Sequence, residues 1–160
     1  MPVTIRPATP ADIDLILTLI RELAVYEKME DEMVNTPELL HAALFGERPS
    51  CEAVVATIDG EDDGFALFYP TFSTFTGLQG LWLEDLYVRP DARGKGAGTA
   101  LLAYGAQLCI ERGWPRYEWT VLDWNEPALA VYRRHGARGM DEWTVQRVSG
   151  EALTQLASRA

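Results

Sequence analysis

Three glycines at alternate positions, Gly94, Gly96 and Gly98, separate a strand-like run from a helical pattern. Residues 81–88 before them are mostly apolar and aromatic, and residues 99–113 after them carry apolar side chains at helical spacing. A strand that enters a helix through a glycine loop presents bare backbone N–H groups and the positive end of the helix dipole, and both favour a phosphate. The pattern therefore predicts an anion site at the junction of a strand and a helix.

Three cations, Arg89, Arg93 and Lys95, stand close to these glycines, although the chain as a whole is acidic. The glycine spacing is neither the dinucleotide-binding fingerprint nor a nucleoside-triphosphate loop. A plain turn between a strand and a helix would need one glycine rather than three with cations beside them. We therefore interpret the loop as phosphate-binding.

An acidic pair, Glu84 and Asp85, interrupts the apolar run before the loop. Adjacent residues of a regular strand face opposite sides of a sheet. The pattern thus predicts that one carboxylate serves a site while the other has a structural role, and the spacing alone does not choose between them.

The rest of the chain predicts one α/β domain that spans residues 1–160. Strands are expected at residues 3–6, 52–58, 65–68, 81–88, 115–122 and 144–148. Helices are expected at residues 10–26, 36–45, 99–113, 125–134 and 150–158, with turn chemistry at residues 59–64. Helical crossovers in the second half indicate a mixed sheet.

Composition is that of a globular protein, with 48% hydrophobic and 24% charged residues. The net charge of −10 argues against nucleic acid or an anionic membrane as a partner, because both attract a basic surface. Two cysteines and two histidines without ligand spacing argue against a metal cofactor or a disulfide framework. We find no signal-peptide pattern and expect a cytoplasmic protein.

The loop, residues 93–98 with the sequence Arg-Gly-Lys-Gly-Ala-Gly, resembles the Arg/Gln-x-x-Gly-x-Gly/Ala acetyl-CoA loop of the GNAT superfamily of N-acetyltransferases. More narrowly, the chain is similar to the diamine (spermidine/spermine-type) N-acetyltransferases over nearly its whole length. The similar segments are residues 5–9, 22–30, 83–88, 93–98 and 124–137.

The resemblance implies a mixed, mostly antiparallel sheet flanked by helices, acetyl-CoA as the co-substrate, direct acetyl transfer to a primary amine, and a homodimer. By this resemblance Tyr132 is the general acid and Glu84 is the carboxylate that handles the amine, while Asp85 is a scaffold residue. The positions that match the family's cofactor site are Leu86, Tyr87, Val88, Arg93, Gly94, Lys95, Gly96, Ala97, Gly98, Thr99, Asn125 and Tyr132.

Three further residues, Tyr26, Glu27 and Glu118, are candidates for substrate contact by position. The acidic stretch that includes the first two, residues 26–32, is either a solvated surface or a rim that attracts a cationic substrate. Tyr132 likewise has a second interpretation as a core aromatic.

The residue types suit amine chemistry. An alkylamine has a pKa near 10.4, so its nucleophilic form costs roughly 4–5 kcal/mol at pH 7. A carboxylate beside the site binds the ammonium and helps to remove its proton, directly or through a water. A backbone N–H such as that of Val88 can stabilise the developing oxyanion, and a phenol can protonate the leaving thiolate.

One departure concerns the substrate. The polyamine enzymes carry an acidic and aromatic loop before residue 81, whereas residues 72–77 of this chain contain no acid. We expect an acceptor among diamines, polyamines and thialysine-like amines, with small or amino-acid-like amines favoured over spermidine and spermine. The alternatives are a protein or peptide N-acetyltransferase of the same fold and a non-catalytic CoA-binding module.

Overall fold

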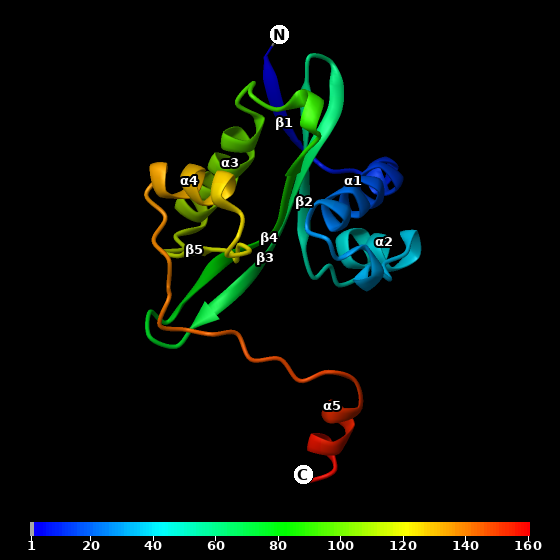
Figure 1. Ribbon diagram of the computed structural model, residues 1–160, viewed down its shortest axis with the longest axis vertical. Helices are drawn as coiled ribbons and strands as arrows, with labels where there is room; N and C mark the ends of the chain where they lie inside the picture. The colour runs from blue at the N-terminus through cyan, green and yellow to red at the C-terminus, as the bar shows by residue number, and fades with distance from the viewer. Residues whose placement is uncertain (1) are drawn as a thin grey trace. The chain divides into compact units, whose positions relative to one another are not determined.

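The computed structural model describes residues 2–160 (Figure 1). Its strands are β1 (Val3–Pro7), β2 (Glu52–Ile58), β3 (Glu61–Ser73), β4 (Leu78–Val88) and β5 (Tyr117–Glu118). Its α-helices are α1 (Ile13–Tyr26), α2 (Pro37–Phe45), α3 (Ala97–Arg112), α4 (Glu126–Arg134) and α5 (Gly150–Ala157). Short 3₁₀ turns occupy η1 (Pro10–Asp12), η2 (Glu30–Glu32) and η3 (Pro90–Ala92). The chain divides into two compact units, one ending at Thr120 and one from Val121 to Ala160.

The first unit contains a sheet in the order β1-β2-β3-β4-β5. Strands β1 to β4 pair antiparallel, and β5 joins β4 in parallel. The expected α/β class and the mixed, mostly antiparallel sheet are therefore confirmed.

Helices cover both faces of this sheet, with α1 and α2 on one side and α3 on the other (Figure 1). The α1/α2 face is an apolar layer in which the helices meet β2, β3 and β4. Its buried members include Ile16, Leu19, Leu40, Leu44, Val55, Phe65, Leu67 and Tyr87. On the other face, Leu101 of α3 is fully buried, and the rings of Tyr104 and Phe68 stack with centroids 6.4 Å apart.

Several expected boundaries were wrong. The β2–β3 turn is only Asp59-Gly60, because both residues adopt positive φ angles (53° and 90°) and close a two-residue hairpin. Consequently β3 runs from Glu61 to Ser73, and its far end pairs with residues 78–80, which extends β4 as well. The loop helix begins at Ala97 rather than at residue 99.

Two expected strands in the second half were also wrong. The strand expected at residues 115–122 is reduced to Tyr117–Glu118, because only these two residues pair with β4. Residues 144–148 form no strand, since they lack a neighbouring strand among the described residues and remain exposed.

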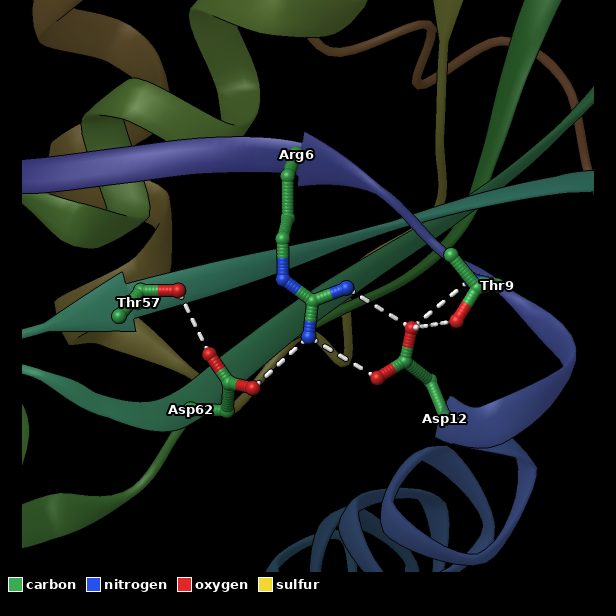
Figure 2. A network of polar contacts seen from close by, with 5 residues as sticks. All are labelled: Arg6, Thr9, Asp12, Thr57 and Asp62. Atoms are coloured by element: carbon green, nitrogen blue, oxygen red, sulfur yellow. Dashed lines mark hydrogen bonds and ion pairs between the residues drawn. The ribbon is translucent and has the colours of Figure 1, made fainter.

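A polar network ties β1 to the start of α1 (Figure 2). The Arg6 guanidinium donates to both oxygens of Asp12 at 2.8 and 2.9 Å and to Asp62 at 2.7 Å. Asp12 also accepts from the backbone and hydroxyl of Thr9, and Thr57 donates to Asp62. The Arg6 hydrogen bonds hold the pKa of Asp12 at about 2, so the carboxylate stays ionised at neutral pH.

Substitution of Gly105 tests the packing of α3 on β5. A Cβ at this position would meet the Tyr117 ring and lie 2.9 Å from Phe68 Cε1. Because overpacking strains a filled core, Gly105→Ala should lower the free energy of unfolding by about 1–3 kcal/mol in urea denaturation.

The matched control is Gly98→Ala in the first turn of the same helix, where a Cβ meets nothing within 4 Å. This change should leave stability unaltered or raise it by up to about 1 kcal/mol, as helix propensity favours alanine. Equal losses in the two variants would contradict the packing argument.

Candidate active site

Strand β4 has an open edge along the second half of its length. It pairs with β5 only at Leu81–Tyr117 and Trp82–Glu118. From residue 83 to residue 88 it pairs with β3 on one side, and on the other side no strand follows it within residues 2–160. Unpaired backbone groups on a strand edge can hydrogen-bond an extended ligand.

This open edge leads directly into the glycine loop. Gly94 and Gly96 adopt φ angles of 79° and 89°, which favour glycine, and α3 starts immediately after Gly96. A Cβ on either residue would meet nothing within 4 Å, so protein packing does not demand the small residue. The loop leaves open space at a helix N-terminus, the arrangement that suits a phosphate.

The three cations near the loop all interact with other groups of the protein. Lys95 forms an ion pair with Asp59 at the β2–β3 turn. Arg89 bridges Glu22 and Asp63 at 3.1 and 3.0 Å.

The third cation, Arg93, donates from Nε to the Val88 carbonyl at 2.8 Å. Its guanidinium carbon lies 5.5 Å from the ring centroid of Tyr26 and 5.7 Å from that of Tyr87. The capacity of the loop for an anion therefore rests on backbone N–H groups and the helix dipole.

A β-bulge in β4 changes the orientation expected for the acidic pair. Leu67 of β3 lies opposite Asp85 and Phe68 lies opposite Leu83, so Glu84 is an extra residue without a counterpart. Leu67 belongs to the apolar layer under α1 and α2, which places Asp85 on that face.

Glu84 faces the same way. It accepts hydrogen bonds from Tyr69 Oη at 3.1 Å and Trp82 Nε1 at 2.9 Å. Tyr69 is two residues after Leu67 on β3 and therefore shares its face, and Trp82 lies opposite Tyr69 on β4. Glu84 is two residues after Trp82, on the same face. The expectation of opposite faces for Glu84 and Asp85 was therefore wrong, because it assumed a regular strand.

Other acids join the pair on this face. Glu118 lies opposite Trp82 across the β4–β5 pairing and so shares its side of the sheet. Glu27 follows the last residue of α1, and its pKa is raised by burial and by the charge of Glu84. The α1/α2 face thus gathers four carboxylates beside the open edge of β4.

The electrostatic consequence is greatest at Asp85. Burial, followed by the charges of Glu84 and Glu27, raises the pKa of the Asp85 carboxyl to about 7. Burial and Glu84 also raise the pKa of Tyr69 to about 12, so its hydroxyl remains a donor to Glu84. Asp85 can therefore both hold and release a proton near neutral pH.

This charge arrangement predicts a pH-dependent cost to stability. Because the pKa of Asp85 is higher in the folded state than the value near 3.9 in an unfolded chain, the folded state binds more protons between about pH 4 and 7, and stability falls as pH rises through that window. Asp85→Asn cannot ionise. The free energy of unfolding of this variant should exceed that of the wild type by nearly zero at pH 4 and by about 1–3 kcal/mol at pH 8. This range allows for the partial exposure of Asp85, which weakens the effect of its charge.

The matched control is Asp12→Asn, measured by the same urea titrations. Since Arg6 holds the pKa of Asp12 at about 2, its stabilising effect is fully present above pH 5. This variant should be destabilised by a constant amount from pH 5 to 8. A flat difference for Asp85→Asn would contradict the burial of its charge.

The second unit carries the two remaining candidates on α4. Asn125 is the N-cap of this helix and accepts from the Ala128 N–H at 3.4 Å. Tyr132 stands seven residues later, which is two helical turns, so the two side chains belong to one face of α4. The structure brings these two together on one helix, and it brings Glu27, Glu84 and Glu118 together on one sheet face.

The family resemblance gave Asp85 a scaffold role, and the sequence pattern did not identify Tyr69 and Trp82 as the donors to Glu84. An acidic pair inside an apolar strand was the available signal. The bulge that places both acids on one face depends on the register between β3 and β4, which the sequence pattern did not reveal.

Two further findings concern residues 2–160. No group of three or more His, Cys, Asp or Glu side chains is arranged to hold a metal ion. No helix in this part of the chain has the length and apolar character needed to cross a membrane.

Comparison with known proteins gives consistent matches. Residues 17–137 match the acetyltransferase (GNAT) family. The thialysine N-epsilon-acetyltransferase of Sus scrofa is 39% identical, over 98% of this chain and 98% of the relative. The L-ornithine N5-acetyltransferase of Arabidopsis thaliana is 30% identical, over 95% of this chain and 86% of the relative.

Solved structures agree in fold. An integron cassette protein from V. cholerae superposes with a TM-score of 0.79 at 27% identity, covering 98% of both chains. A ribosomal-protein-alanine N-acetyltransferase from Brucella melitensis superposes with a TM-score of 0.75 at 25% identity, covering 94% of this chain and all of the other.

Proposed function

This chain belongs to the acetyltransferase (GNAT) family, and we propose that it transfers the acetyl group of acetyl-CoA to the side-chain amine of a small, amino-acid-like molecule. One observation carries the proposal. The bulge at Glu84 turns two adjacent carboxylates to one face of β4, beside the open edge that leads into the glycine loop. An amine site and an anion site thus share one strand.

The co-substrate would be held by backbone groups. The N–H groups of residues 94–99 and the N-terminus of α3 suit its pyrophosphate, and the open edge at residues 86–88 suits its amide-bearing arm. Asn125 and Tyr132 of α4 are the further cofactor contacts that the family resemblance implies. When bound, acetyl-CoA supplies an acetyl group already activated as a thioester.

The acidic face would receive the substrate as an ammonium ion. Glu84 accepts hydrogen bonds from two neutral donors, Tyr69 and Trp82, which hold its carboxylate in place to bind the cation. Asp85 would then take the proton. Transfer from an alkylammonium to a carboxylate with a pKa of about 7 costs about 5 kcal/mol, whereas an ordinary aspartate would require about 9 kcal/mol.

The leaving thiolate needs a proton in return. We assign this step to the Tyr132 phenol, because a phenol is protonated at pH 7 and can donate a proton to a thiolate. Val88 would contribute its backbone N–H to the developing negative charge on the carbonyl oxygen.

The substrate class rests on two facts. Relatives that align along nearly the whole chain are named for thialysine and L-ornithine, both amino acids with a side-chain amine. Residues 72–77, the end of β3 and the turn into β4, offer no acid for the distal charge of a long polycation. An amino-acid-like amine therefore fits better than spermidine or spermine.

We also propose that the protein is a homodimer, as the family resemblance implies, and that it is cytoplasmic, as expected from the sequence. In the second unit, Trp143, Val145 and Leu156 are exposed by 78%, 73% and 56%, and a second subunit would cover such apolar surface. Light scattering coupled to size exclusion measures the mass directly.

A thiol-release assay with acetyl-CoA tests the function. The panel is thialysine, ornithine, putrescine, spermidine, spermine and a peptide with an N-terminal alanine. We expect the highest kcat/KM for thialysine or ornithine. A preference for the peptide would favour protein acetylation, and release with no acceptor would favour a CoA-binding module.

Two isosteric variants separate the roles of the carboxylates. Asp85→Asn should lower kcat by about 100-fold or more and abolish the rise of kcat/KM through pH 7, because the proton acceptor is lost. Glu84→Gln should mainly raise KM for the amine and retain that rise. If Glu84→Gln rather than Asp85→Asn removes the rise, the two assignments must be exchanged.

Tyr132→Phe removes only a hydroxyl from α4. It should reduce kcat by about 10- to 100-fold with both KM values changed less than about twofold, because the proton donor acts in the transition state. Steady-state kinetics with acetyl-CoA and the preferred amine measure this. An unchanged kcat would return Tyr132 to a packing role.

A further inference from the structure

Arg93 is the first residue of the glycine loop, but its side chain contacts residues of other elements. Its Nε donates to the Val88 carbonyl at the end of β4. Its guanidinium lies within 6 Å of the ring centroids of Tyr26, the last residue of α1, and Tyr87 of β4. A planar guanidinium against two phenol rings is a cation–π arrangement, which orients as well as attracts.

Both aromatic partners of Arg93 belong to elements that carry the acidic face. Tyr26 immediately precedes Glu27, whose carboxyl is close enough to Glu84 and Asp85 for their charges to influence one another. Tyr87 stands two residues after Asp85 on the same face of β4. One side chain thus connects the start of the anion loop to the two elements that present carboxylates to the amine.

We propose that Arg93 is a positioning residue that couples the two substrates, so that occupation of the glycine loop by CoA strengthens binding of the amine. The inference rests on the proposed function and deepens it. A pyrophosphate bound by the N–H groups of residues 94–99 fixes the loop backbone, and with it the base of the Arg93 side chain. The guanidinium then holds Tyr26, and therefore Glu27, in place at the acidic face.

The coupling between CoA binding and amine binding is reciprocal, and the contacts of Arg93 limit its size. By linkage, the amine must strengthen CoA binding by the same factor that CoA strengthens amine binding. Two partly exposed cation–π contacts correspond to a coupling of about 5- to 30-fold. An arginine that acted only as a phosphate ligand would instead change CoA affinity and leave the coupling intact.

Calorimetry of the non-reacting pair, CoA and the amine that the thiol-release panel ranks first, measures both quantities. We expect thialysine to be that amine. In the wild type, saturating CoA should lower the Kd of the amine by about 5- to 30-fold. In Arg93→Gln this factor should fall below about twofold, while the Kd of CoA alone changes less than about threefold.

Three variants sharpen the result. Arg93→Lys keeps the charge but loses the planar group and should not restore coupling. Tyr26→Leu alters only the α1 side of the contact and should lose coupling with CoA affinity unchanged. Lys95→Met, which removes a loop cation paired with Asp59, should keep the coupling.

The opposing outcomes are distinct. A loss of CoA affinity of tenfold or more in Arg93→Gln, restored by lysine and with coupling retained, would make Arg93 an anion ligand and overturn the inference. A wild type that acetylates the amine without any coupling would also overturn it, and the proposed function would stand. A wild type that acetylates no amine would overturn the proposed function itself.

Discussion

The unequal pairing of β4 is the constraint on which the candidate site depends. This strand pairs with β3 from Leu78 to Val88 but with β5 at only two positions. If β5 followed β4 to its end, the backbone groups at residues 83–88 would be satisfied within the sheet and no extended ligand could use them. The departure of β5 therefore leaves the edge that leads to the glycine loop, and the bulge at Glu84 lies at the start of that edge.

The acidic face is an arrangement that lowers stability. The Asp85 carboxyl lies half-buried, near two other acids, on a face whose buried layer is otherwise largely aliphatic and aromatic. Fold stability alone would favour an apolar residue there. Groups with strongly shifted pKa values are common at functional sites. Burial that destabilises the charge of a carboxylate also raises its pKa, so that the group can exchange a proton near neutral pH. Asp12 shows the opposite arrangement, because its ion pair with Arg6 and its hydrogen bonds from Thr9 keep its pKa low and stabilise the fold.

The sequence predicted the elements that depend on local pattern. The loop before α3, the start of α2 and the turn between β2 and β3 follow from residues close together in the chain. Features that depend on pairing between distant segments were missed. The bulge can be located only once the register between β3 and β4 is known. The length of β5 is set by the point at which it separates from β4. Residues 144–148 have the composition of a strand, but no neighbouring strand among the described residues pairs with them. For the same reason the sequence suggested Arg93 as a loop cation, whereas its partners lie in α1 and β4.

Charge is distributed so that one acidic chain can accommodate both a polyanion and a cation. With a net charge of −10, long-range attraction favours the amine and opposes CoA. Two of the three cations near the loop are already paired with carboxylates, Lys95 with Asp59 and Arg89 with Glu22 and Asp63, so they add little attraction of their own. Affinity for the anion must then come from oriented backbone dipoles, which act at short range and carry no net charge. Such a loop can hold a pyrophosphate without repelling an ammonium ion that enters the acidic face of the same strand.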